Sequence, residues 1–208
     1  MNDTKSETRR LILASGSPRR RELLRRIGVT FEVVPADIDE TIPPGISAVD
    51  AVRMLARRKA EAVAEQYRQH LVLGADTTVV LGSGADERIL GKPVDDEDAA
   101  AMLKMLRGGT HLVHSGYALC CMDDDTFVEG VASTEVELAD IDDEAIAAYV
   151  ATGEPRDKAG GYAIQGIASM FVKSIAGSYS NVVGLPLAEV VDELKRCGVW
   201  RPDLLRNE

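Results

Sequence analysis

The sequence predicts an α/β fold, in which short apolar strands alternate with amphipathic helices. Three observations favour it. An apolar run at 11–14 is followed by a turn and by a helix that reaches residue 27. The stretch 71–82, LVLGADTTVVLG, is the most apolar of the chain and is typical of a central strand. Two long strands, 110–122 and 126–138, are joined by an acidic turn and form a hairpin.

The other elements follow from the same patterns. We expect strands at 31–34, just before Gly91 and at 171–175, and helices at 47–69, 95–106, 142–151 and from a turn at 181–186 to about 197. The chain has 208 residues, of which 45% are apolar and 28% charged, as in globular proteins. We find no repeat and no clear interdomain linker.

Net charge and composition exclude several classes of protein. The net charge of −10 argues against a general binder of nucleic-acid polymers, yet residues 9–26 contain seven arginines and one glutamate. A local basic patch in an acidic chain indicates one small anion site. No apolar run is long enough to span a bilayer or to form a signal peptide, and the three cysteines include no CxxC pair. We therefore expect a cytoplasmic protein that has no membrane partner.

The first strand–turn–helix unit provides the candidate anion site. Ser17 is a favoured N-cap and Pro18 fits the first helical position, so free N–H groups and the positive helix end meet at one place. Arg20 falls on the apolar stripe of this helix, and Arg19 lies beside the cap. Both are candidates for holding phosphate through paired hydrogen bonds. The alternative is a helix that is merely rich in arginine.

Two charged residues lie where apolar ones are expected. Lys59 is on the apolar stripe of the helix at 47–69, where its ammonium either reaches the helix edge or points into a cleft. Asp76 interrupts the central strand, at a cost of roughly several kcal/mol unless it is paired, protonated or bound to metal. Pairing with an arginine would satisfy it, but we favour a functional role. Thr77 faces the other side of a regular strand, so we expect both at one site only if the backbone bends or Thr77 acts through its backbone.

Three further residues complete the candidate set. Glu40 lies in an acidic loop that follows the strand at 31–34, and loops at strand ends often carry sites, although most acidic loops are only solvated. Lys92 lies between Gly91 and Pro93 and can complete a phosphate clamp. Gln165, in the glycine-rich stretch 154–166, offers a donor and an acceptor that can read a base edge.

His111 and His114 point to opposite faces of a strand, so a shared metal is not expected.

Together these residues are the parts needed to cleave a nucleoside triphosphate. Basic groups hold phosphates, carboxylates bind a cation or orient water, and an amide reads a base. The sequence contains neither GxxxxGK[ST] nor a kinase GxGxxG loop, which disfavours P-loop hydrolysis and kinase chemistry. From the residues alone, the chain indicates metal-assisted phosphate chemistry and leaves the broken bond undetermined.

The motifs LILASGSPRRRELL, DIDE, LGADTTV, GKP, DKAGGYAIQG and NVVGLPL, in this order, resemble those of the Maf family of nucleoside triphosphate pyrophosphatases, from about residue 11 to 197. The resemblance implies a Maf/Ham1-like (ITPase-like) mixed twisted sheet flanked by helices, with two lobes around a central cleft. It implies one catalytic domain over 11–208, after an N-terminal extension at 1–10, and hydrolysis to the monophosphate and pyrophosphate with Mg²⁺ or Mn²⁺. A homodimer is plausible on the same ground.

The resemblance also assigns roles residue by residue. Arg19, Thr77 and Gln165 are similar to the residues at these places in the branch of the family that acts on dTTP and UTP, including modified uridine triphosphates. Asp76 matches the family's water-activating base. The resemblance leaves open whether Asp76 also binds metal. Our expectation is that the cation binds at Asp76 and Glu40. The other active-site matches are Ser15, Arg20, Glu40, Lys59 and Lys92. The alternative is a nucleotide-binding regulator of cell division or septum formation without significant turnover.

Overall fold

The computed structural model describes residues 10–206 and shows a mixed sheet of seven strands in that range. The strands are β1 (Leu11–Leu13), β2 (Phe31–Val33), β3 (Leu71–Leu81), β4 (Arg88–Leu90), β5 (Thr110–Cys121), β6 (Thr126–Leu138) and β7 (Val172–Ala176). Their order is β2-β1-β3-β5-β6-β7, with β4 also paired to β3. The β1 pairings are parallel and the others antiparallel. The expected mixed sheet is confirmed.

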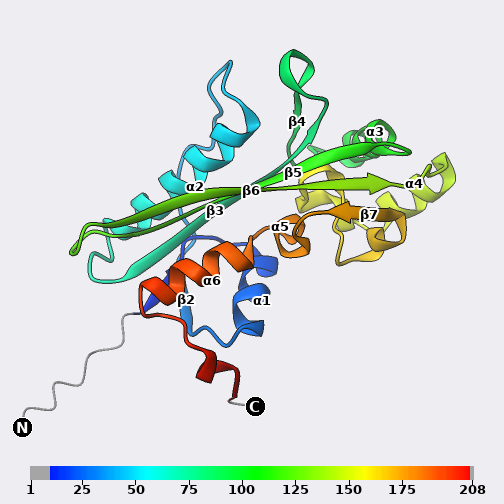
Figure 1. The fold of residues 1–208 in the computed structure, drawn as a ribbon. Coiled ribbons are helices and arrows are strands. Elements are labelled where there is room, and N and C mark those ends of the chain that lie inside the picture. Colours follow the sequence, from blue (N-terminus) through cyan, green and yellow to red (C-terminus); the bar gives the residue numbers. More distant parts are fainter. Residues whose placement is uncertain (1–9, 207–208) are drawn as a thin grey trace, which may run out of the picture.

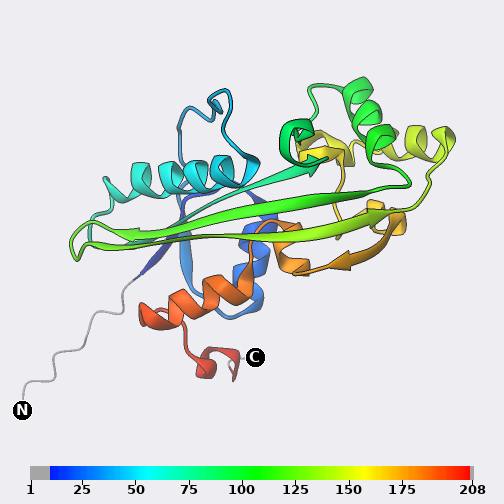
Figure 2. The same cartoon turned by 45° about the horizontal axis from the view of Figure 1, so that its top comes forward.

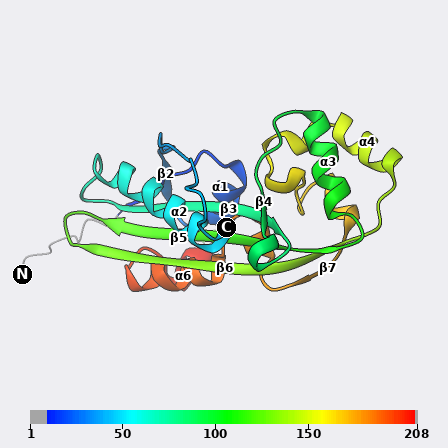
Figure 3. The ribbon, with the colours of Figure 1, turned by 90° about the horizontal axis from the view of Figure 1, so that it is seen from above.

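Helices cover both faces of this sheet and form two lobes. The helices are α1 (Pro18–Arg26), α2 (Ala48–Ala64), α3 (Asp96–Leu106), α4 (Asp143–Ala151), α5 (Tyr179–Val183) and α6 (Leu187–Arg196), with 3-10 turns at Gly84–Asp86, Glu154–Asp157, Ala159–Gly161, Ile167–Phe171 and Pro202–Arg206. In Figure 1, α2 lies on one face and α1 and α6 on the other. Figure 3 shows α3 and α4 grouped at the far end, with β5 and β6 running through both lobes.

Most predicted elements lie within one or two residues of the observed ones, with two differences. The helix expected to reach residue 69 ends at Ala64, because the chain then turns, with His70 N–H on the Tyr67 carbonyl, to deliver Leu71 into β3. The turn expected at 181–186 contains part of α5, whose N-cap Ser178 accepts from the Asn181 N–H. No helix in the described range is long and apolar enough to cross a bilayer. The extension expected at 1–10 lies, except for Arg10, outside the described residues.

Two glycines let α2 lie directly on the sheet. A Cβ at Gly74 of β3 would lie 2.2 Å from the Ala56 carbonyl oxygen, and one at Gly116 of β5 would lie 2.3 Å from the Val52 oxygen. Asp76 is the cross-strand neighbour of Gly116, so it shares the face of the sheet that α2 covers. This close approach brings the buried face of α2 down to the middle of β3.

One edge of β3 is open between its two partners on that side. β1 pairs only with residues 71–73 and β4 only with 79–81, whereas β5 covers the opposite edge from Val72 to Val80 without a register shift. Within the described range, residues 74–78 therefore have no strand on this edge. Figure 2 shows α1 beginning near this part of the sheet. Both faces of β3 become accessible from the same gap.

Candidate active site

A cavity of about 470 Å³ opens at this gap, and its walls come from both lobes. All nine residues predicted from the sequence line it: Ser15, Arg19, Arg20, Glu40, Lys59, Asp76, Thr77, Lys92 and Gln165. They derive from the β1–α1 turn, α1, the loop before α2, α2, β3, the loop after β4 and the loop before β7. Segments more than a hundred residues apart in sequence thus meet in one place, although their chemical roles stay predictions.

Lys59 of α2 joins two carboxylates. Its Nζ donates to Asp76 Oδ1 at 2.6 Å and lies 2.9 Å from Glu40 Oε1, while its side chain is only 10% exposed. The ammonium thus points into the cleft and does not reach out along the helix edge, which decides between the two alternatives for this residue. Burial raises the pKa of Glu40, but the Lys59 hydrogen bond and the charges of Lys59, Lys92 and Arg20 outweigh it and lower that pKa.

Arg20 is buried with its guanidinium on neutral oxygens. Nε donates to the Gly184 carbonyl at 2.8 Å, Nη1 to Ser15 Oγ at 3.0 Å and Nη2 to Thr77 Oγ1 at 3.0 Å. Burial lowers the Arg20 pKa, and the Asp76 charge opposes this. Among the described residues, no carboxylate forms an ion pair with Arg20. Its charge is oriented but not neutralised by contact, which suits an incoming phosphate.

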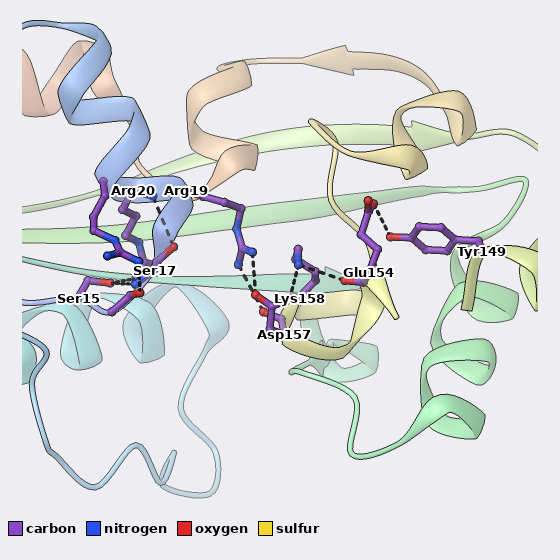
Figure 4. Close-up of polar contacts among 10 residues, drawn as sticks. Ser15, Ser17, Arg19, Arg20, Tyr149, Glu154, Asp157 and Lys158 are labelled. Atoms are coloured by element: carbon purple, nitrogen blue, oxygen red, sulfur yellow. Dashed lines mark hydrogen bonds and ion pairs between the residues drawn. The ribbon is translucent and has the colours of Figure 1, made fainter. Parts of the chain in front are cut away.

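Arg19, next to Arg20 on α1, points instead to the loop after α4. Figure 4 shows it reaching Asp157, where Nη1 lies 3.1 Å from Oδ2 and Nη2 lies 3.4 Å from the backbone oxygen. Lys158 contacts the other Asp157 oxygen and donates to the Glu154 carbonyl at 3.1 Å. Burial raises the Asp157 pKa, but Lys158 and Arg19 lower it further than burial raises it. This bridge spans the cleft between α1 and the Gln165 loop.

Arg19 and Gln165 also line a second, smaller hollow of about 320 Å³ beside the main cavity. Two of the three residues matched to substrate choice therefore line both hollows, whereas Thr77 lines only the main cavity. In the second hollow they are joined by Glu154, Asp157 and Lys158 of the 154–166 loop, whereas no residue of the Lys59 cluster lines it.

The expectation that Asp76 and Thr77 share a site only through a bend or a backbone contact is wrong. β3 runs regularly against β5 through both residues, and the two side chains do face opposite sides. Asp76 meets Lys59 of α2, and Thr77 Oγ1 accepts from Arg20 of α1 and lies 2.8 Å from Ser115 Oγ. Both line one cavity because the open edge of β3 exposes both faces.

A family model described as Maf-like protein matches residues 10–197, nearly the whole described range. The chain belongs to the Maf family. Similar proteins named dTTP/UTP pyrophosphatase include that of Pelotomaculum thermopropionicum, 47% identical over 90% of this chain and 96% of that protein. That of Bacillus cereus is 49% identical over 92% and 97%, and that of a Geobacillus species 49% identical over 91% and 99%. The Staphylococcus aureus Ham1 structure is more remote, with a TM-score of 0.44 and 18% identity over 64% of this chain and 73% of that one.

Several polar residues of this Maf protein's site were not singled out from the sequence. Asp157 and Lys158 line the cavity, and their signal was the DKAGGYAIQG motif itself. Ser115 and Asn181 are fully buried behind Thr77, where Ser115 Oγ donates to the Asn181 carbonyl at 3.0 Å. Asn181 belongs to the NVVGLPL motif, whereas no sequence signal distinguished Ser115 from other strand serines.

His111 and His114 contact different residues. His111 Nε2 lies 2.7 Å from the Tyr162 hydroxyl, and His114 Nδ1 lies 2.7 Å from Ser133 Oγ. Burial lowers the His111 pKa to about 4. Because Tyr162 lines the cavity, the neutral imidazole supports the cavity wall from behind.

The donor set of the cavity fits a divalent cation that phosphates help to hold. Asp76 and Glu40 converge on the Lys59 nitrogen, so their oxygens approach a common point. No cluster of three or more His, Cys, Asp or Glu suited to a metal occurs in the described residues. Mg²⁺ is commonly bound by one or two carboxylates together with substrate phosphates, and a third protein carboxylate is not needed. Asp76 and Glu40 are the residues that would hold it.

Proposed function

We propose that this Maf protein hydrolyses nucleoside triphosphates, with dTTP and UTP as preferred substrates, to the monophosphate and pyrophosphate. Modified uridine triphosphates, which present a similar base edge, are included. The relatives named dTTP/UTP pyrophosphatase, which match the chain over at least 90% of its length, support this assignment. The observation that carries it is the cavity in which Asp76 and Arg20 stand on opposite faces of β3.

The proposed chemistry divides the cavity residues into two groups. Asp76 accepts a proton from the attacking water, whose oxygen bonds to the α-phosphorus while the bond to the bridging oxygen of the leaving pyrophosphate breaks. Arg20, Ser15 and Lys92 hold the pyrophosphate as its negative charge grows. Lys59 keeps the Asp76 and Glu40 carboxylates in position. A divalent cation, when bound, offsets phosphate charge at these carboxylates.

Substrate choice is assigned to Arg19, Thr77 and Gln165. The Gln165 amide has a donor and an acceptor, and the uracil and thymine edge offers the O4 acceptor beside the N3–H donor. One amide therefore matches both bases by two hydrogen bonds. Arg19 stands beside Gln165 at the rim. Thr77 acts on substrate choice indirectly, through the hydrogen bond that it accepts from Arg20.

The experiment is a turnover panel. Purified protein is incubated with dTTP, UTP, CTP and GTP in Mg²⁺ or Mn²⁺, and the monophosphate and pyrophosphate are both quantified. We expect equimolar monophosphate and pyrophosphate, and the highest kcat/KM for dTTP and UTP. Release of orthophosphate alone, or nucleotide binding without turnover as in a regulator of septum formation, contradicts the proposal.

We further propose a cytoplasmic location and a homodimer. The buried free thiols of Cys120 and Cys121 are in keeping with a reducing compartment. The homodimer rests on the family resemblance, and light scattering coupled to gel filtration tests it by the molar mass in solution.

A further inference from the structure

Gln165 lies on a segment that strand pairing does not hold. It precedes the 3-10 turn Ile167–Phe171 and lies within a turn closed by the Gly166 N–H, which donates to the Ala163 carbonyl at 3.0 Å. Such short turns contribute few hydrogen bonds of their own. The direction in which the Gln165 amide points thus depends on side chains that fix the segment from outside.

Glu154 is the side chain that fixes it. Its Oε2 accepts from the Ile167 N–H at 3.0 Å, and its Oε1 accepts from the Ala168 N–H at 3.3 Å. Oε1 also accepts from the Tyr149 hydroxyl at 3.0 Å, a contact that Figure 4 shows beside the Asp157–Lys158 bridge. A carboxylate that accepts from two successive backbone N–H groups and one hydroxyl forms strong, directional bonds.

Gly166 makes this arrangement possible. A Cβ at Gly166 would lie 2.4 Å from Glu154 Oε1, so only a residue without a side chain lets the carboxylate approach the backbone directly after Gln165. The carboxylate is itself anchored, because Tyr149 packs edge-on against Phe171 with ring centroids 5.5 Å apart. Nearby, Arg156 holds Asp96 of α3 through two hydrogen bonds of 3.0 and 3.1 Å.

We propose that Glu154 is a positioning residue for base selection, which holds the Gln165 amide at the angle needed to read the pyrimidine edge. The inference rests on the proposed function. Glu154 does not line the main cavity and touches no residue of the Lys59–Asp76 cluster. Its removal therefore affects how the base is recognised and leaves the water-activating group in place.

The test replaces Glu154 by Gln, which keeps the shape. Whichever way the amide turns, its NH₂ meets a backbone N–H donor, Ile167 in one orientation and Ala168 in the other. We expect KM for dTTP and UTP to rise by about tenfold, as for one lost hydrogen bond, with kcat within about threefold of wild type. Preference for UTP over CTP should fall in parallel. Glu144→Gln, the same change at an exposed position of α4, is the matched control.

Two results with folded Glu154→Gln overturn the inference, and a third concerns the case in which this variant does not fold. One is an unchanged KM and unchanged UTP/CTP ratio in folded Glu154→Gln, and the other is a loss of kcat that is equal for all four nucleotides with KM unchanged. If wild type turns over no nucleotide, the proposed function fails instead. Tyr149→Phe removes only one of the three donors and keeps the ring, so it should shift KM in the same direction by less. If Glu154→Gln does not fold and Tyr149→Phe behaves as wild type, the inference is also rejected.

Discussion

Lys59 and Asp76 form the tightest link between α2 and the sheet at the candidate site, with Nζ 2.6 Å from Oδ1. The same nitrogen lies 2.9 Å from Glu40, so one ammonium stands between the two carboxylates assigned to the cation. A cation that binds there shares these oxygens with Lys59. The balance of charge in the cleft therefore depends on three side chains that act as one group.

Asp76→Asn should reduce kcat for dTTP by about 100-fold or more, because the amide cannot accept the proton from water. Nucleotide binding should persist, since Arg20 and Lys92 are unchanged. Activity assays and calorimetric titration of dTTP measure the two effects separately. Loss of the folded state, seen in a thermal melt, would instead assign Asp76 a structural role.

Lys59→Met should make stability depend on divalent cations. Removal of the ammonium takes away the ion-pair partner that Asp76 and Glu40 share, and a cation relieves the repulsion between the two carboxylates. Addition of Mg²⁺ should then raise Tm more in the variant than in wild type, and EDTA should abolish turnover in wild type. Arg58→Met, at the adjacent exposed position, is the control. An equal Mg²⁺ shift in all three proteins would argue against a cation at these carboxylates.

Gly116→Ala should lift α2 from the sheet. The new Cβ would meet the Val52 carbonyl at 2.3 Å, so the helix must move, at a cost of about 1–3 kcal/mol in the free energy of unfolding. Because Gly116 is the cross-strand neighbour of Asp76, kcat should fall as well. Gly109→Ala, whose Cβ would have its nearest contact at 3.7 Å, should change neither quantity by much. Urea denaturation and the turnover assay give the two values.

The low pKa of His111 should make the folded protein less stable in mild acid. Its pKa is about 4 in the folded protein and about 6.5 when unfolded, so between these values the unfolded chain binds the extra proton. The free energy of unfolding thus falls as pH drops from about 6.5 to about 4, by on the order of 3 kcal/mol at most. His111→Gln, which can still bond to Tyr162, lacks this loss. The difference in the free energy of unfolding between wild type and His111→Gln should therefore narrow as pH falls. A difference that stays constant with pH in urea titrations would refute this.

Gln165→Glu should change base preference more than overall rate. The substitution removes the amide donor but keeps the size, so the O4 acceptor of uracil or thymine meets a carboxylate oxygen. We expect kcat/KM for dTTP and UTP to fall by about tenfold or more, and that for CTP, which presents a donor there, to fall less. An equal loss for every nucleotide would count against base reading by Gln165.

The elements were predictable from local pattern, and the long-range arrangement was not. Ser17 caps α1 and Ser47 caps α2 as their sequences indicate, since capping is a matter of neighbouring residues. Lys59 and Asp76 were recognisable as polar residues on apolar elements. Their contact, however, depends on Gly74 and Gly116, whose closeness to α2 is a tertiary property. Likewise, Thr77 could not be placed without knowing that β1 stops at Leu13 and leaves the β3 edge open.

Because this edge of β3 is open, two adjacent residues, Asp76 and Thr77, contribute their side chains to the cavity from opposite faces of the sheet. Asp76 is anchored to α2, whereas Thr77 is anchored to α1 and to the α5 turn through Arg20 and Gly184. A change at one position thus disturbs only the packing layer on its own side. A substitution at Thr77 therefore perturbs the contacts with α1 and the α5 turn, and one at Asp76 perturbs the contact with α2. One short stretch of strand thus connects two separately packed layers of the molecule to a single cavity.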